Sequence, residues 1–162
     1  MSDMLVKLYA IDYKFDTDLP SQKITIKKAS IIDKDSILEF VRSNFESGRT
    51  WAHECEYALF NNPTTCYIAV QNKEIIGFSC YDSTAKGFFG PMGVKASHRK
   101  KGIGQELLLR SLFSMKESGY AYAIIGWSST EAIKFYKDTV NAIEIEDSPP
   151  NKSVYKNCIS QE

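Results

Sequence analysis

The stretch GPMGVKASHRKKGIGQELLL, residues 90–109, decides the fold of this 162-residue chain. It joins a short apolar segment to a loop rich in basic residues, then to Gly102-Ile103-Gly104, and then to a leucine-rich segment with helical period. Backbone N–H groups in the first turn of a helix lack intrahelical partners and lie at the positive end of the helix dipole. A strand that enters a helix through such a loop is therefore typical of a phosphate-binding site.

The basic residues of this loop favour the same interpretation. Three consecutive cations stand before the glycines: Arg99, Lys100 and Lys101. An arginine can bind phosphate through two parallel hydrogen bonds, and Gly102 and Gly104 let an anion approach the backbone closely. The alternative is that the glycines only allow a tight turn beside a solvated basic loop. A P-loop is excluded because no Gly-Lys-Ser or Gly-Lys-Thr follows, and a dinucleotide fingerprint would need glycine where Leu107 stands.

The residues around this stretch predict alternating strands and helices. Two β-rich runs separated by a three-residue connection favour an antiparallel hairpin, and a nearly continuous apolar run after the helix favours a strand covered on both faces. The predicted strands are 24–30, 65–70, 74–81, 88–94, 120–127, 142–147 and 153–159. The predicted helices are 4–11, 33–45 with Asp33 as cap, 51–60 with Thr50 as cap, 102–118, and 130–140 capped by Ser128 or Ser129.

This order predicts an α/β (α+β) fold with a mixed central sheet of six to seven strands flanked by helices. The helical crossover between residues 88–94 and 120–127 predicts that these two strands are parallel neighbours. The length fits one domain, and we expect it to cover residues 23–162. Residues 1–22 have no clear period, and we interpret them as an N-terminal extension.

The composition excludes several classes of function. Lys plus Arg number 20 and Asp plus Glu number 20, so no net field draws the chain to nucleic acid or to anionic lipid. No segment approaches the roughly 18 apolar residues that a membrane span needs, and the first residues lack a signal-peptide pattern. The cysteines, Cys55, Cys66, Cys80 and Cys158, form no CxxC pair, so we expect free, mostly buried thiols and no metal. These features predict a cytoplasmic protein.

The stretch Val94–Leu109, with RKKGIG at its centre, resembles the coenzyme A signature of the GNAT (N-acetyltransferase) superfamily: Arg or Gln, two residues, Gly, any residue, then Gly or Ala. A second segment, SSTEAIKFYKDTVNA, resembles the family's Asn-x-x-Ala-x-x-x-Tyr helix. Ala132 and Tyr136 are in register with it, and Ser129 stands where Asn is usual. The resemblance covers residues 24–147. It implies a bacterial-type single-domain member with a GNAT-like sheet, splayed between its two parallel central strands.

The resemblance implies that the chain binds acetyl-coenzyme A (acetyl-CoA) as a cosubstrate and no metal. An amine would attack the acetyl group directly, through a tetrahedral intermediate. The pantetheine arm would insert between the splayed strands and pair with backbone groups, as an added strand does. The residues implied to contact the cofactor are Met92, Gly93, Val94, Arg99, Lys100, Lys101, Gly102, Ile103, Gly104, Ser129 and Tyr136.

Two proton transfers need candidate residues. Tyr136 is the family's candidate for the general acid that protonates the departing thiolate, and the alternative is a tyrosine that only packs its helix against the sheet. An alkyl ammonium has a pKa of about 10.4 and must lose a proton before it attacks. Many relatives carry a Glu for this on the strand before the loop, but residues 88–94 contain no acid. The remaining candidates are Asp82, Glu54, Glu56, His53 and His98.

Glu54 leads this group because the second helix usually borders the acceptor cleft in the family, although removal of the proton through water is equally acceptable. Four aromatic residues, Trp51, Tyr81, Phe89 and Trp127, are candidates for an acceptor pocket that suits a ring, an apolar group or a cation. Their alternative role is ordinary core packing.

Three rival functions stay open. The chain could bind acyl-CoA as a sensor without catalysis, contact nucleic acid through residues 98–101, or acetylate protein lysines. The balanced charge disfavours the last two. We therefore expect the amine of a small molecule or a peptide as acceptor, with no nucleic acid and no membrane as partner, and we leave a homodimer open.

Gly104→Glu should abolish acetyl-CoA binding while the fold survives, because the new carboxylate would fill and repel the space that a phosphate approaches. Isothermal titration calorimetry with acetyl-CoA measures the binding, and circular dichroism checks the fold. An unchanged affinity would contradict the assignment of the loop.

Overall fold

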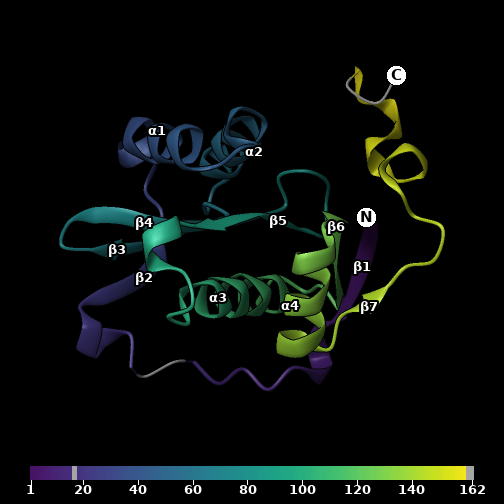
Figure 1. Cartoon of the computed structure of the whole chain (residues 1–162), viewed down its shortest axis with the longest axis horizontal. Helices are drawn as coiled ribbons and strands as arrows, with labels where there is room; N and C mark the ends of the chain where they lie inside the picture. The colour runs from purple at the N-terminus through teal and green to yellow at the C-terminus, as the bar shows by residue number, and fades with distance from the viewer. Residues whose placement is uncertain (16–17, 160–162) are drawn as a thin grey trace.

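The structure is a computed structural model that describes residues 1–15 and 18–159. Within them, a seven-stranded mixed sheet has the order β2-β3-β4-β5-β6-β1-β7, with α1 and α2 on one face and α3 and α4 on the other (Figure 1). This architecture confirms the predicted fold class. The strands are β1 (Ser2–Lys7), β2 (Ile24–Lys28), β3 (Cys66–Gln71), β4 (Glu74–Tyr81), β5 (Phe88–Val94), β6 (Tyr122–Ser128) and β7 (Ile143–Glu144). The α-helices are α1 (Lys34–Asn44), α2 (Gly48–Phe60), α3 (Ile103–Glu117) and α4 (Thr130–Val140).

The central part of the chain forms the elements that the sequence predicted. β3 and β4 make the antiparallel hairpin, in which Cys66 lies opposite Cys80. Asn72 and Lys73, in the connection, have φ angles of 50° and 65°, as the tight turn of a two-residue hairpin requires. α3 joins β5 to β6, which are parallel neighbours as predicted.

The N-terminus differs from the prediction of a helix over residues 4–11. Residues 2–7 form β1, which lies between β6 and β7 and is antiparallel to both, and a short 3-10 helix, η1 (Leu8–Ala10), follows. Met4, Val6 and Leu8 are fully buried. These three residues alternate as the buried residues of a strand do. The alternation is too short to stand out in residues 1–22, so the sequence did not reveal a strand here. Residues 2–7 are therefore an interior strand of the sheet.

The C-terminal part also differs from the prediction. Residues 142–147 contribute only the two-residue β7, and residues 153–159, predicted as a strand, instead contain the 3-10 helix η6 (Val154–Asn157). Another 3-10 helix, η5 (Pro150–Lys152), precedes it. Pro149 and Pro150 have no N–H to donate to a sheet ladder, which favours the departure from the sheet edge. The chain then crosses to the face that carries α1 and α2 (Figure 1).

Asp33 stands at the N-cap position of α1 as predicted, but its side chain makes no capping hydrogen bond. The predicted cap Thr50 is wrong, because α2 begins at Gly48 with Ser47 at the N-cap position. Ser129 does cap α4, where its hydroxyl oxygen accepts a hydrogen bond from the N–H of Ala132 at 3.3 Å.

The sheet separates two hydrophobic layers. Phe78 of β4 is fully buried against α1 and α2, and Leu107 of α3 is fully buried on the opposite face. Burial of such a side chain stabilises the fold by about 1.5–3 kcal/mol. A buried polar pair, the hydroxyls of Ser79 and Ser111, is satisfied by a mutual hydrogen bond of 2.8 Å. None of the helices in the described part of the chain has the length and apolar character that a bilayer crossing needs.

The close approach of α1 and α2 depends on a glycine. The chain turns sharply after α1, and the N–H of Gly48 donates to the carbonyl of Phe45 at 3.0 Å. A Cβ atom at Gly48 would lie 2.4 Å from the carbonyl oxygen of Val41. Because that neighbour is backbone, any side chain here would push the two helices apart.

Gly48→Ala should lower the free energy of unfolding by about 1–3 kcal/mol, the usual cost of overpacking. Gly104→Ala is the matched control, since a Cβ there would lie 3.7 Å from its nearest neighbour, an ordinary contact. Urea unfolding followed by circular dichroism compares the two variants. Equal midpoints for Gly48→Ala and the parent would show that the helix pair is not closely packed at this position.

Candidate functional site

The parallel pair β5 and β6 opens after two residues. Among the described residues, pairing between them is confined to Phe88 with Ile124 and Phe89 with Ile125, although the strands continue to Val94 and Ser128. Over the same length β5 keeps its pairing with β4. An opening therefore lies between residues 90–94 and 126–128, with backbone groups along both inner edges. Such edges can pair with an extended molecule that carries amides.

Local backbone geometry accompanies this opening. Gly90 has a φ angle of 116°, which favours glycine, and Pro91 has no N–H. On β6, Trp127 has a φ angle of 52°, and its N–H donates to Oδ1 of Asp3 at 2.9 Å. Asp3 lies on β1, on the side of β6 away from β5, and its carboxylate thus stabilises this uncommon backbone conformation near the end of β6.

The loop beyond β5 and the start of α3, the predicted anion cradle, place free N–H groups beside positive charge. The N–H of Glu106 donates to the carbonyl of Gly102 at 3.1 Å as the first bond of the helix, so the N–H groups of residues 103–105 precede the ladder. Gly102 has a φ angle of 85°, and a Cβ at Gly104 would have ordinary contacts, so packing does not require glycine at position 104. The three cations of the loop are all exposed: Arg99, Lys100 and Lys101.

Side-chain hydrogen bonds fix this loop to the sheet. Nε of Arg99 donates to the carbonyl of Val94 at 3.2 Å, at the end of β5. The ring of His98 forms a hydrogen bond of 3.0 Å with Gln71 at the end of β3. Strand-to-helix geometry and local positive charge therefore coincide at one end of the opening.

Tyr136 of α4 lies beneath the point where the strands part. Its ring packs edge-on against Phe89, with 6.2 Å between centroids, and against Phe135 at 5.3 Å. Only 8% of the residue is exposed, and burial raises the pKa of its phenol far above the ordinary value. The phenol is therefore protonated at neutral pH. Its role as a general acid stays a prediction beside the packing role that these contacts describe.

Glu54 of α2 lies beside the loop that precedes β5. The hydroxyl of Thr84 in that loop donates to Oε1 of Glu54, and the neighbouring Ser83 hydroxyl donates to the carbonyl of Gly90 at 3.1 Å. Burial raises the pKa of the Glu54 carboxyl, and the hydrogen bond from Thr84 opposes this rise. A carboxylate of raised basicity thus stands at the other end of the opening from the anion cradle.

The other base candidates have different surroundings. Asp82 lies in the loop that joins β4 to β5, and both of its carboxylate oxygens accept from the hydroxyl of Tyr120, just before β6, at 3.0 Å. Glu56 forms an ion pair of 3.2 Å with a lysine of α1, and His53 is exposed. His98 lies in the anion-binding loop. Glu54 is the candidate whose hydrogen bonding links it to the opening.

The structure does not gather the four predicted pocket aromatics on one face. Trp51 packs with Phe45 and Phe78 on the α1–α2 face. Tyr81 and Phe89 belong to the core on the α3–α4 face, where Tyr81 also lines a cavity of about 450 Å³. Trp127 lies at the open end of β6 and is 39% exposed. Of the four, Trp127 is the one located beside the opening.

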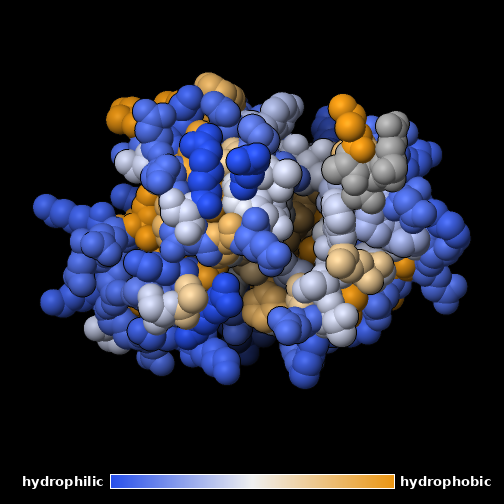
Figure 2. Space-filling view, turned by 45° about the horizontal axis from the view of Figure 1, so that its top comes forward, coloured by the Kyte–Doolittle hydropathy of each residue, from blue (hydrophilic) through white to orange (hydrophobic). Residues whose placement is uncertain are grey.

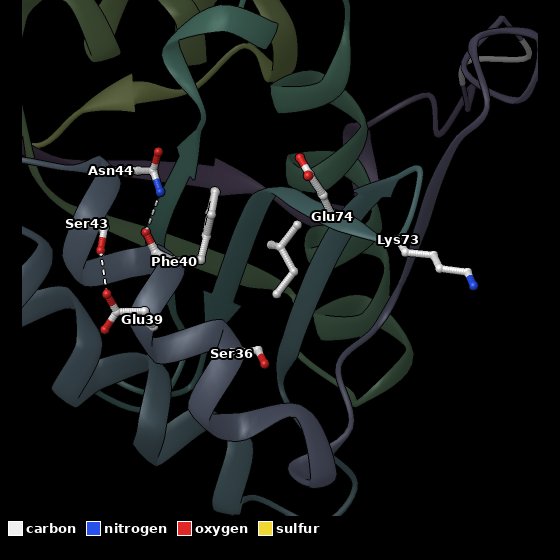
Figure 3. A pocket seen from close by; sticks show the side chains of 8 residues that line it. Ser36, Glu39, Phe40, Ser43, Asn44, Lys73 and Glu74 are labelled. Atoms are coloured by element: carbon white, nitrogen blue, oxygen red, sulfur yellow. Dashed lines mark hydrogen bonds between the residues drawn. The ribbon is translucent and has the colours of Figure 1, made fainter.

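The opening has a hollow on the α1–α2 side. Figure 2 shows the surface depressed between the α1–α2 pair and the C-terminal segment, with hydrophobic residues in the depression. A second depression, of about 350 Å³, lies between α1 and the start of β4, and its side chains face a shallow space (Figure 3). Ser43 there donates to Glu39 at 2.8 Å. Because β4 runs antiparallel to β5 and Gly77 pairs with Val94, the start of β4 and this second depression lie near the end of β5 that leads into α3.

Three cysteines form a buried group that the sequence did not reveal. The Sγ atoms of Cys55, Cys66 and Cys80 all lie within 4.8 Å of one another, between α2, β3 and β4. All are free thiols, as expected, and burial raises the pKa of Cys80. Three soft ligands of this kind suit thiophilic metal ions. The expectation that the protein binds no metal stays a prediction.

Sequence reasoning missed four further residues near the opening: Asp3, Thr84, Ser128 and Tyr155. In the described part of the chain, the hydroxyl of Ser128 is the buried side-chain oxygen without a hydrogen-bond partner. It lies at the end of β6, on the edge of the opening. Buried hydroxyls are usually paired, so this one fits a ligand that inserts between the strands. No sequence signal marks such residues, because the fold alone places them together.

Known proteins resemble this chain in fold. A family model described as acetyltransferase (GNAT) family matches residues 34–139, more than half of the chain. A GCN5-related glucosamine N-acetyltransferase region of a fungal multi-domain GH3 β-N-acetylglucosaminidase has a TM-score of 0.68 and 16% identity, over 89% of this chain and 19% of that one. A GCN5-related N-acetyltransferase from Sphaerobacter thermophilus has a TM-score of 0.63 and 18% identity, over 89% and 48%.

The ribosomal-protein-alanine N-acetyltransferase from Brucella melitensis biovar Abortus 2308 has a TM-score of 0.57 and 16% identity, over 77% of this chain and 95% of that one. The chain spans less than half of the length of the two other solved structures. No curated protein sequence matches. At such identities these likenesses concern the fold, and the acceptor of each relative is a property of that relative.

Tyr136→Phe should lower turnover and leave the affinity for acetyl-CoA nearly unchanged, because it removes the proton donor and keeps the packed ring. Thiol release measures turnover and calorimetry measures affinity. Tyr57→Phe is the control, since Tyr57 is 58% exposed on α2. Equal activity of Tyr136→Phe and the parent would leave Tyr136 with a packing role alone.

Proposed function

The chain belongs to the GNAT acetyltransferase family, and from this premise we propose that it transfers the acetyl group of acetyl-CoA to the amine of a small molecule or a peptide. The observation that carries the proposal is the opening between β5 and β6, with an anion-binding helix start at one end and Glu54 at the other. Buried free thiols support a reducing compartment, and we propose the cytoplasm.

Several residues are suited to hold acetyl-CoA. The N–H groups of residues 103–105 and the cations of the loop would bind its pyrophosphate. Backbone groups of Met92, Gly93 and Val94 would pair with the amides of its pantetheine arm, because β6 leaves that edge of β5 open. The unpartnered hydroxyl of Ser128 supports insertion at the same place.

Acetyl-CoA supplies an acetyl group that is activated as a thioester. On this proposal Glu54 accepts the proton of the incoming ammonium, directly or through another group, so that the neutral amine can attack. A backbone N–H on the inner edge of β5 would stabilise the oxyanion of the tetrahedral intermediate. Tyr136, kept protonated by its burial, would then donate its proton to the departing thiolate.

A non-catalytic acyl-CoA sensor is the second candidate, because β5 has no acidic residue and Tyr136 is almost fully buried. The two candidates differ in one measurable respect, which is the release of thiol in the presence of an amine. Calorimetric titration with acetyl-CoA, followed by a thiol-release screen, therefore tests the proposal.

The relatives guide the choice of amines for the screen. One is named for glucosamine and another for the alanine of a ribosomal protein, so acceptors differ widely on this fold. The panel should therefore include aminosugars, amino acids, alkyl amines and peptides with a free N-terminus. Binding with thiol release supports the enzyme, binding without release from any amine favours the sensor, and absence of binding overturns both.

Glu54→Gln should reduce kcat/KM for the amine by about 10²–10⁴, the usual contribution of a general base. In the parent, kcat/KM should fall as the pH drops through the pKa of Glu54, since the protonated carboxyl cannot accept a proton. Burial raises that pKa, so the fall should occur at higher pH than for an ordinary carboxyl group. Thr84→Val should move it higher still, because it removes the hydrogen bond that favours the carboxylate.

Glu56→Gln is the control on the same helix, since Glu56 forms its ion pair with α1. The pH dependence of kcat/KM for all four proteins, measured by thiol release, checks the prediction. An unaltered profile in Glu54→Gln would assign the proton transfer to another group.

A further inference from the structure

Three buried cysteines converge between α2 and the hairpin of β3 and β4. The Sγ atoms of Cys55, Cys66 and Cys80 all lie within 4.8 Å of one another, and 3.9 Å separates those of Cys55 and Cys66. Cys66 and Cys80 lie opposite each other on the two strands, and α2 brings Cys55 to them. All three residues are fully buried. Three separate elements therefore place three sulfur atoms around one point.

This convergence offers more than core packing. A free cysteine in a core usually acts as a small apolar residue among aliphatic and aromatic neighbours. Such neighbours, Ile68 and Phe78 among them, surround this group too. Packing does not require, however, that the buried thiols meet one another. The described part of the chain has three buried thiols, and all three meet here.

The spacing of the sulfurs suits a single ion. An ion about 2.3 Å from each of three thiolates, as zinc is in proteins, holds them at most about 4.0 Å apart. Cys55 and Cys66 already meet this spacing, and the widest pair needs to approach by less than about 1 Å. Among the described residues, no His, Asp or Glu joins the group as a fourth ligand. The site is therefore three-coordinate, whereas structural zinc sites are closed by four ligands.

The surroundings limit the charge that a bound complex can carry. In the described part of the chain, the buried charged side chains are Asp3 and Glu106, which belong to β1 and α3. Glu56, next to Cys55 on α2, is partly exposed and paired with Lys34 at 3.2 Å. No buried cation is thus present to balance a negative complex. Three thiolates would leave one negative charge with zinc and two with monovalent copper, and burial of an unpaired charge is costly.

We propose that Cys55, Cys66 and Cys80 form a binding site for a trivalent thiophilic element, arsenic or antimony, which enters as its neutral trihydroxide. Three thiolates neutralise a trivalent ion completely, so the complex fits an apolar core. The proposal is carried by the three convergent sulfurs and, among the described residues, by the lack of a fourth ligand and of a buried cation. The expectation of no metal then holds for divalent ions such as zinc and fails for trivalent ones.

The exchange leaves no free charge. With arsenite, As(OH)3 and three thiols give As(S-Cys)3 and three molecules of water. Each S–H bond and each As–O bond breaks, an As–S bond forms, and the thiol proton leaves on the departing hydroxide. Nothing is oxidised or reduced, and no proton is released to solvent. Burial raises the pKa of Cys80, so this thiol starts protonated, as the exchange requires.

The test uses sodium arsenite and the full-length Cys158→Ser variant, kept reduced by a phosphine. Cys158 is exposed and lies outside the group, so its removal eliminates a competing thiol and keeps the site. Native mass spectrometry should show one arsenic atom per chain with three hydrogens lost, whereas a two-thiol adduct keeps one hydroxyl. Cys80→Ala in the same background should lower the affinity for arsenite by about 100-fold or more, because one of three linked bonds is lost.

Thermal unfolding followed by circular dichroism gives a second readout. The three ligands come together only in the folded chain, so arsenite should raise the Tm of Cys158→Ser. It should leave the Tm of the double variant with Cys80→Ala nearly unchanged, and zinc chloride should raise the Tm of Cys158→Ser less than arsenite does. Cys55→Ala gives the same comparison if Cys80→Ala fails to fold.

A three-thiol adduct that raises the Tm and depends on Cys80 supports the site. The absence of an adduct, an adduct that keeps a hydroxyl, or equal affinity in Cys80→Ala overturns it. A larger rise in Tm with zinc than with arsenite overturns the assignment of a trivalent ligand. None of these results involves acetyl-CoA, so the site and the proposed acetyl transfer stand or fail separately.

Discussion

The site depends on one limit in the sheet: β5 and β6 share only two residue pairs. A parallel pair that continued to the strand ends would satisfy its own backbone groups and leave no edge for a ligand. Because the pairing stops at Phe89, two inner edges stay open between an anion-binding helix start and the loop beside Glu54. The opening thus begins where the pairing stops and ends where β5 passes into the loop before α3.

Both ends of the chain contribute to keeping that opening in place. β1 is an interior strand, and Asp3 binds Trp127 on one side and, through its own N–H, Ser148 on the other. One residue therefore couples the backbone of β6 to the start of the C-terminal segment that carries Tyr155. The buried carboxylate is satisfied by a backbone donor, which reduces the cost of its burial.

Burial sets the acid–base character of the groups around the opening. It raises the pKa values of Glu54, Tyr136 and Tyr155 in the same direction, which makes the carboxylate a better base and keeps both phenols protonated. The two phenols lie on opposite sides of the sheet, one in the α3–α4 core and one in the C-terminal segment. On the proposed mechanism, Glu54 removes a proton on the α1–α2 face and Tyr136 supplies one on the α3–α4 face.

The sequence by itself determined the crossover from β5 through α3 to β6 and the hairpin of β3 and β4, because both are encoded in contiguous residues by period and glycine. It also predicted an anion site in the loop before α3, from glycine and charge in one short stretch. Only the tertiary structure decided which acid meets the opening, since the Thr84–Glu54 contact joins residues 30 apart in the chain. It also decided the places of Asp3 and Tyr155, which come from opposite ends of the chain and carry no local pattern. Contacts between distant segments are set by how layers pack, and packing leaves no periodic signal in a single stretch of sequence.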